Sequence, residues 1–140
     1  MSVSVSDLVR SYASLRDAVS QSAGPGGRLL QFYSVEYGLK AAYLGKQGMN
    51  ARGTESLPQE LRSHDLRRLV KELRLGHADL AGLSTCRRQQ RRQQSQQDPV
   101  EHHELHQAWR YGAPLEESDE KRAVSALDML SDWCRKEHRR

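Results

Sequence analysis

Two histidines and one arginine recur at intervals of four residues, as His102, His106 and Arg110. Residues four apart lie on one side of a helix, so a helix through this segment would align the three side chains. Histidine titrates near neutral pH and serves as a general acid or base, whereas arginine is a permanent cation suited to phosphate. The spacing therefore indicates acid–base chemistry on a phosphate ester, with His106 and Arg110 as the central pair.

The same histidines allow two other interpretations. His102 and His106 could supply half of a metal site, with Glu101 or Glu104 as a neighbour. No glutamate completes the His-Glu-x-x-His zinc pattern, and the sequence identifies no further ligands. The histidines could also form a solvated helix face that is anchored by a buried Trp109. We predict no metal and no cofactor.

A second set of polar residues interrupts apolar sequence. Glu36 and Lys40 are one helical turn apart within an apolar segment, and His64 and Asp65 open a later amphipathic segment. A Glu–Lys pair at this spacing adds about 0.2–0.5 kcal/mol to a helix, and its simplest placement is at the surface. Asp65 suits the positive end of a helix dipole, while His64 either packs against the preceding loop or takes part in catalysis. We predict structural roles for these four polar groups.

The segment 87–92 carries four arginines and no acid: Arg87, Arg88, Arg91 and Arg92. The net charge of the whole chain is +4, so the remainder is neutral overall. Dedicated nucleic-acid binders usually spread basic residues over a whole face. We expect a flexible Arg/Gln-rich loop at about 85–98, whose arginines are either solvated or bind the phosphates of RNA or DNA.

The hydrophobic periodicity predicts helices and no strands. The second predicted helix is apolar nearly all round, which places it at the centre of the domain. On it, Gly38 and Gly45 share a face and are expected to let another helix or subunit approach closely. The tetrapeptide Gly24-Pro25-Gly26-Gly27 is predicted to be a turn. The predicted helices cover about 6–22, 28–47, 63–76, 98–109 and 118–135.

Length and composition bound the class of protein. A chain of 140 residues with 36% hydrophobic and 29% charged residues is expected to form a single domain over 1–140. Cys86 and Cys134 are expected to be reduced thiols, and neither a signal peptide nor a membrane span is recognisable. We therefore predict a cytoplasmic, all-α protein, an antiparallel up-and-down bundle of about five helices.

The order of these features resembles the HEPN superfamily, the helical domains named for higher eukaryotes and prokaryotes nucleotide-binding proteins. The resemblance covers roughly residues 28–133, with the Arg/Gln tract as an insertion. It rests on Glu36-x-x-x-Lys40-Ala41, on His64-Asp65-Leu66 and on Trp109-Arg110-Tyr111. It implies a HEPN-like bundle that commonly forms homodimers. Many members of the superfamily are metal-independent ribonucleases of toxin–antitoxin, CRISPR or phage-defence systems.

The chain departs from the motif by which those ribonucleases act. That motif is an arginine followed by a histidine after four to six residues, in which arginine steadies the phosphate and histidine shuttles a proton. After Arg110, the corresponding positions hold Leu115, Glu116 and Glu117. Carboxylates there would repel a phosphate.

Two hypotheses follow. In the first, the protein is a non-catalytic or divergent HEPN-like homodimer, an interaction or regulatory component of a bacterial defence or toxin–antitoxin system with a partner from the same operon. In the second, it is a metal-independent ribonuclease that uses His106 and Arg110, with a two-fold axis bringing two such pairs together and the arginine strip holding RNA.

Overall fold

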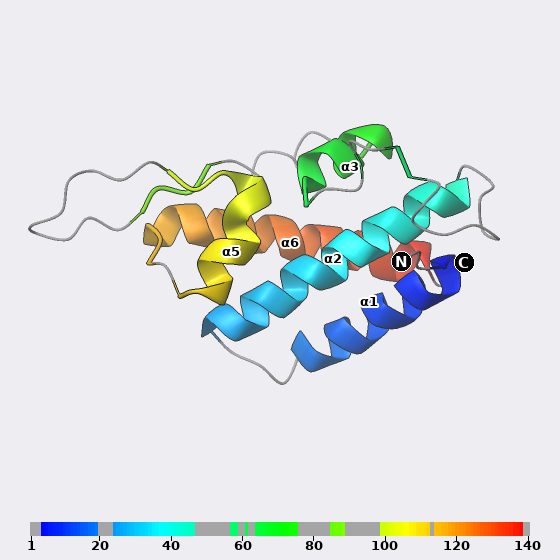
Figure 1. The fold of residues 1–140 in the computed structure, drawn as a ribbon, viewed down its shortest axis with the longest axis horizontal. Coiled ribbons are helices and arrows are strands. Elements are labelled where there is room, and N and C mark those ends of the chain that lie inside the picture. Colours follow the sequence, from blue (N-terminus) through cyan, green and yellow to red (C-terminus); the bar gives the residue numbers. More distant parts are fainter. Residues whose placement is uncertain are drawn as a thin grey trace, which may run out of the picture.

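The computed structural model describes residues 4–19, 24–46, 57–58, 61, 64–75, 85–88, 99–112 and 114–138. This part of the chain forms five α-helices, one 3-10 helix and two isolated β-bridges, which confirms the predicted all-α fold (Figure 1). None of its helices is long and apolar enough to cross a bilayer. The helices are α1 (Val5–Val19), α2 (Gly24–Lys46), α3 (Leu66–Glu72), η3 (His102–Glu104), α5 (Leu105–Arg110) and α6 (Glu117–Glu137).

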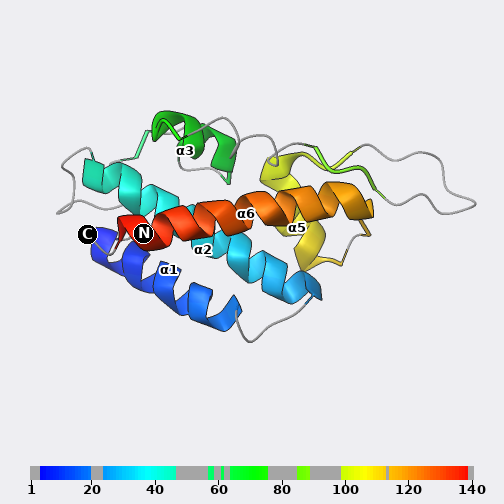
Figure 2. The ribbon, with the colours of Figure 1, turned by 180° about the vertical axis from the view of Figure 1, so that it is seen from behind.

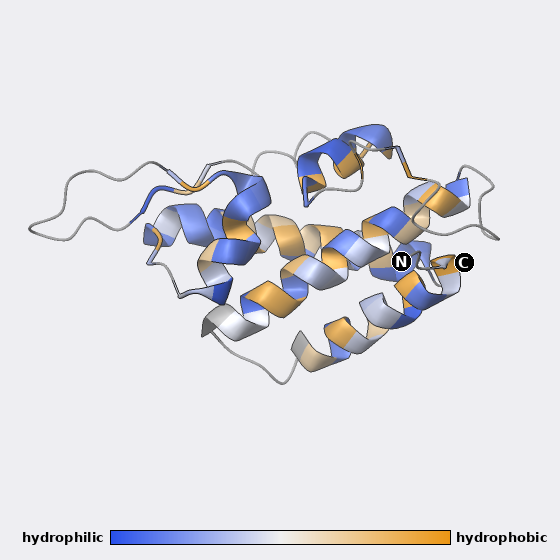
Figure 3. Cartoon of the chain, in the orientation of Figure 1, coloured by the Kyte–Doolittle hydropathy of each residue, from blue (hydrophilic) through white to orange (hydrophobic). Residues whose placement is uncertain are grey.

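Helix α2 is the hub of the bundle. It contacts α1, α3, α5 and α6, and its Phe32, Val35, Leu39 and Leu44 are fully buried. Apolar residues recur along α2 in Figure 3, as expected for a helix covered from several sides. Figures 1 and 2 show α1 along one side of α2 and α6 across the face that Figure 2 presents. The predicted central position of this helix is confirmed.

The directions of the long helices follow from their contacts. Helices α1 and α2 form an antiparallel pair, since Val5 and Val9 lie near the end of α2 at Ala42 and Gly45. Helix α6 runs along α2 in the same direction: Arg28 near the start of α2 pairs with Glu120, and the Gly38 carbonyl further along accepts a bond from His138. The α5 segment lies at the end of the bundle where α2 and α6 both begin (Figure 1).

Gly38 sets the spacing of the three long helices. A Cβ atom there would lie 2.7 Å from Sγ of Cys134 on α6 and 2.9 Å from Cδ1 of Tyr12 on α1. Both distances are below ordinary van der Waals contact, so only glycine fits. The predicted close approach at Gly38 is confirmed, and the neighbours are two helices of the same chain.

Two helix starts differ from prediction. The predicted turn at 24–27 was wrong, because α2 already begins at Gly24; proline is tolerated in a first turn, where its missing N–H has no helical partner. Helix α3 begins at Leu66, three residues after the predicted start at about 63, and Asp65 is its N-cap. The Asp65 carboxylate accepts a 3.2 Å hydrogen bond from the Arg68 amide, three residues later, as an N-cap side chain does.

The segment on either side of the Arg/Gln tract is more ordered than predicted. Cys86 and Val100 exchange two backbone hydrogen bonds of 2.8 Å, and Arg88 bridges Leu115. The expected flexible loop was therefore wrong for 85–88, while 89–98 lie outside the described residues. These bonds occupy the backbone of Val100, so the helix predicted from residue 98 begins at His102 as a 3-10 turn and becomes α-helical at Leu105.

Candidate functional site

A polar pocket of about 600 Å³ opens where α2, the start of α3 and the η3–α5 segment meet. Tyr33 of α2 forms one wall and His64, just before α3, forms another. The remaining wall comes from η3, α5 and the turn that follows, with His103, Glu104, His106, Gln107, Arg110 and Tyr111. The pocket thus gathers residues that the sequence separates by almost eighty positions.

A buried carboxylate holds His64 in this pocket. Oε1 of Glu36 lies 2.6 Å from Nδ1 of His64, and Oε2 of Glu36 lies 2.9 Å from Nζ of Lys40. The Glu36 side chain is 4% exposed and that of Lys40 9%, whereas the His64 side chain is 46% exposed. The predicted surface placement of Glu36 and Lys40 was wrong. Burial of this pair is tolerated because both carboxylate oxygens of Glu36 have a partner, one in Lys40 and the other in His64.

The start of α3 fixes the backbone of His64. The next residue, Asp65, caps α3 and also lies 2.6 Å from Nε2 of His102. Burial alone would raise the pKa of Asp65, but the bonds from His102 and from the Arg68 amide outweigh it and lower that pKa. Asp65 therefore stays ionised and joins α3 to η3, as its predicted structural role requires.

His106 lies behind His64 and not at the open surface. The two imidazole centroids are 4.1 Å apart, the His106 ring also packs on Phe32, and the residue is 6% exposed. Its Nδ1 atom is buried without a hydrogen-bond partner within the described part of the chain. Burial, reinforced by the neighbouring His64, lowers the pKa of His106, so its neutral form is favoured.

The predicted line of three side chains is broken. His106 and Arg110 both line the pocket, but His102 turns to Asp65 and is not among the lining residues. His102 belongs to the 3-10 turn, which has fewer residues per turn than an α-helix, so it leaves the side of the helix that His106 and Arg110 share. Among the described residues, no group of three or more histidine, cysteine or acidic side chains could hold a metal ion.

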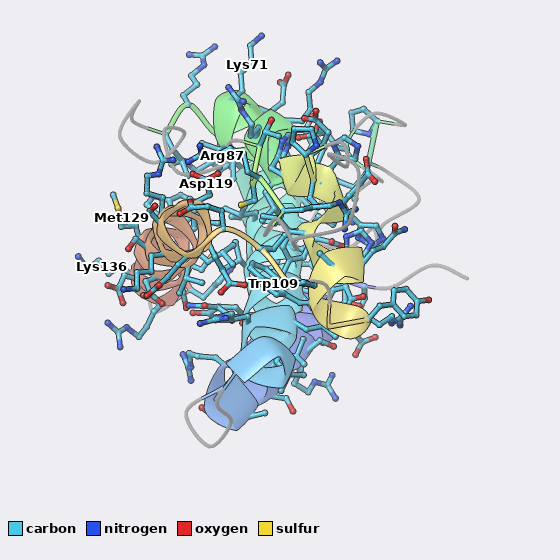
Figure 4. All side chains as sticks on the ribbon, turned by 90° about the vertical axis from the view of Figure 1, so that its left-hand side faces the viewer. Lys71, Arg87, Trp109, Asp119, Met129 and Lys136 are labelled. Carbon is cyan, nitrogen blue, oxygen red and sulfur yellow. The ribbon has the colours of Figure 1, made fainter. Side chains whose placement is uncertain are left out.

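Trp109 is buried next to the pocket-lining residue Arg110 and holds this end of α5 against the core. Its Nε1 donates a 3.1 Å bond to Glu120, which also receives Arg28 at 2.6 Å. Figure 4 shows Trp109 in the interior between α5 and α2. Its neighbour Arg110 is thereby held at the surface, where the guanidinium lines the pocket.

The arginine strip is only partly available for phosphate. Nε of Arg87 lies 2.9 Å from Asp119, whose carboxylate also accepts the Arg87 amide at 3.0 Å and binds Arg122 (Figure 4). The bonds from Arg87 hold the pKa of the buried Asp119 well below its usual range. Arg88 is half-buried in its bridge to Leu115. Arg91 and Arg92 lie outside the described residues.

The sequence prediction gave the acid–base role to His106 and left catalysis by His64 as an alternative; the structure places His64 at the open pocket and His106 behind it. The available signal was Glu36: a carboxylate within a helix that is apolar all round must find a partner. The pocket holds two exposed imidazoles, His64 and His103. Of these, His64 lies 2.6 Å from the buried carboxylate of Glu36, and the guanidinium of Arg110 lines the same pocket. Comparisons with protein-family models, curated proteins and solved structures gave no match to this chain.

Proposed function

We propose that this protein is a metal-independent ribonuclease in which His64 moves the proton and Arg110 binds the phosphate. The observation that carries the proposal is the 2.6 Å contact between Glu36 and Nδ1 of His64, within the pocket that Arg110 lines. A buried carboxylate on one ring nitrogen fixes the tautomer and leaves the other nitrogen for chemistry. The proposal transfers the acid–base role from His106 to His64.

The reaction is transesterification within the RNA backbone. Nε2 of His64 takes the proton of a ribose 2′-OH, and the 2′ oxygen attacks the adjacent phosphorus. The bond from phosphorus to the 5′ oxygen breaks, giving a 2′,3′-cyclic phosphate, and His64 returns its proton to the departing 5′ oxygen. Arg110 stabilises the charge on the phosphate oxygens during this step. No redox partner is required, and the proton balance closes on His64.

The neighbouring groups tune this centre. Lys40 donates a 2.9 Å hydrogen bond to the second oxygen of Glu36, so both carboxylate oxygens have a partner within the core. His106, favoured in its neutral form, supports the His64 ring without adding a competing positive charge. The carboxylate of Glu104 lies 3.6 Å from Nε2 of His103. A positive charge on His103 would offset the repulsion between Glu104 and a bound phosphate.

Cleavage of a mixed RNA pool in the presence of EDTA tests the proposal. His64→Ala should lower the initial rate by about 10²–10⁴-fold, the usual contribution of a general acid–base group, and Arg110→Ala by about 10²–10³-fold. Lys136→Ala removes an exposed cation on α6 that points away from α5 in Figure 4 and should leave the rate unchanged. Wild-type protein that leaves RNA intact, or His64→Ala that cleaves at the wild-type rate, would refute the assignment.

A second function has its own supporting observation. His106 is buried against His64 and favoured in its neutral form, so it is not an exposed partner that could protonate the leaving group. A site of this kind could bind RNA or a nucleotide without cleaving it. The protein would then be a HEPN-like interaction or regulatory component of a bacterial defence or toxin–antitoxin system, homodimeric and working with a partner. Tight RNA binding without any cleaved product would favour this function.

The HEPN-like relationship stays part of both proposals. The all-α fold, with α2 as its hub and with Glu36 bonded to both Lys40 and His64, supports it. Three of the residues on which the resemblance rests thus meet in one cluster.

A further inference from the structure

We infer that Tyr111 and Gln107 form a nucleobase subsite beside the phosphate position, so that the ligand is RNA with unpaired bases. The inference rests on the proposed RNA-binding function of the pocket. It starts from Tyr111, which lines the pocket and yet is 78% exposed. Among the described residues, the only other exposed large hydrophobic side chain is Met129 on α6, at 45%. An aromatic ring left open at the rim of a polar pocket is a surface on which a base can stack.

The backbone holds Tyr111 in this open position. Trp109, two residues earlier, is buried and bonded to Glu120, and the Tyr111 amide still donates to the Gln107 carbonyl at 3.0 Å. The chain then turns at Gly112, whose φ of +67° suits glycine. The backbone bond to Gln107 and the turn at Gly112 therefore place Tyr111 at the end of α5, at the rim of the pocket.

The wall of the pocket is divided between two neighbouring rows of side chains. His106 and Arg110 are four residues apart and form one row, in which Arg110 supplies the positive charge and the buried His106 is neutral. Gln107 and Tyr111 have the same spacing one residue later, so they form an adjacent row rotated by about 100° around the helix. The first row matches a phosphate. The second offers a stacking face and, from Gln107, an exposed amide that can both donate to and accept from the edge of a base.

This division selects unpaired bases. In a duplex, each base is stacked on both faces and its edge is occupied by its partner, so neither Tyr111 nor Gln107 could engage it. In a single strand, the base next to the bound phosphate is free to rotate onto the ring. The volume of the pocket, about 600 Å³, lies within the range typical of small-molecule sites.

Fluorescence anisotropy with the full-length protein tests this subsite. The probe is a labelled single-stranded RNA dodecamer of mixed sequence with 2′-O-methyl riboses, which bind but cannot be cleaved. We expect Tyr111→Ala to weaken binding by about 5- to 150-fold, the range for loss of one stacked base, and Tyr111→Phe to bind within twofold of wild type. Met129→Ala is the matched control, since it removes the other exposed large apolar side chain, which Figure 4 shows on the outside of α6. A duplex of the same sequence should bind at least tenfold more weakly than the single strand.

The outcomes separate this inference from the proposed function. Cleavage of unmodified RNA with equal KM in wild type and Tyr111→Ala would overturn the base subsite while leaving the ribonuclease intact. Binding that depends on Tyr111, without any cleavage of unmodified RNA, would support the subsite and overturn the ribonuclease. Equal affinity for the duplex and the single strand, or no RNA binding by wild type, would overturn the subsite.

Discussion

Glu36 is the residue that most constrains how the site works. Its carboxylate is buried, and each of its two oxygens has a partner, Lys40 on one side and His64 on the other. A buried charge is tolerated only when paired in this way, because an unpaired one costs several kcal/mol. Since Nδ1 of His64 is bonded to Glu36, Nε2 is the ring nitrogen that the proposed reaction would use.

Glu36→Gln tests this assignment. A glutamine amide can donate as well as accept, so it no longer forces the proton onto Nδ1 of His64. We expect the ring-nitrogen NMR signals of His64 at pH 8 to report the Nδ1–H tautomer in wild type and a shift toward Nε2–H in the variant. The rate of RNA cleavage should fall together with that shift. An unchanged tautomer with an unchanged rate would show that Glu36 only fills space.

His106 makes stability depend on pH. Its pKa in the folded protein lies below the ordinary value of 6.5 because the ring is buried and sits against His64. Below pH 6.5 the unfolded chain therefore binds a proton at His106 that the folded chain does not. The contribution of His106 to the free energy of unfolding is complete above pH 6.5 and is lost as the pH falls toward the pKa of His106 in the folded protein. We expect the urea-derived free energy of unfolding to drop less between pH 7.5 and 5.5 in His106→Phe than in wild type. Equal drops would contradict this origin.

Among the elements, the packing of α1, α2 and α6 depends on the absence of a side chain at Gly38. Gly38→Ala places a methyl group 2.7 Å from Sγ of Cys134 and should destabilise the fold by about 1–3 kcal/mol, the usual cost of overpacking. Gly26→Ala, in the same helix, meets nothing within 4 Å and should be neutral or slightly stabilising. Denaturant midpoints measure both. A Gly38→Ala midpoint equal to that of Gly26→Ala would show that the helices can separate without cost.

The strand-like segment 85–88 is held to α6 by Asp119. The same contacts shield Cys86, whose pKa burial and the nearby Asp119 raise to about 11; burial raises the pKa of Cys134 to about 12. We expect both thiols of the native protein to react slowly with a thiol reagent at pH 8, because little thiolate forms. Asp119→Asn weakens the hold of Arg87 and should speed modification of Cys86 alone, with Cys134 as the internal control. Equal acceleration at both cysteines would indicate general unfolding instead.

Sequence periodicity predicts the long helices well and the short connections poorly. The stripes of α1 and α6 and the apolar circumference of α2 are local patterns, so their burial follows from the sequence. The bonds between Cys86 and Val100 join distant residues, and no local pattern encodes them. Because of these two bonds, the helix that the sequence predicts from residue 98 begins only at His102.

The candidate site is predictable to a similar extent. His106 and Arg110 share a helix face by spacing alone, and the structure keeps them together. The meeting of Glu36 with His64 depends on how α3 docks on α2, which spacing within either segment does not determine. The apolar neighbours of Glu36 show only that its carboxylate needs a partner.

For the whole molecule, the main observation is that described residues of a single chain already place Tyr33, His64 and Arg110 around one pocket. Helix α2, whose apolar surface first suggested a homodimer, is covered by helices of its own chain. If the protein forms a homodimer, as the HEPN resemblance implies, light scattering will report twice the mass of 16.0 kDa. The rate of RNA cleavage per chain should nevertheless stay constant on dilution below the dimer dissociation constant. A rate that falls in proportion to the dimer would show that the partner copy completes the site.

The most direct test of the central claim is the chemical identity of the cleaved ends. Phosphorus NMR of a short RNA incubated with wild-type protein and EDTA should reveal a 2′,3′-cyclic phosphate. The product should be absent with His64→Ala and absent when the ribose at the cleavage site is 2′-O-methylated. A product with a 5′-phosphate, or cleavage that survives blockage of the 2′-OH, would contradict a reaction in which His64 activates the ribose hydroxyl.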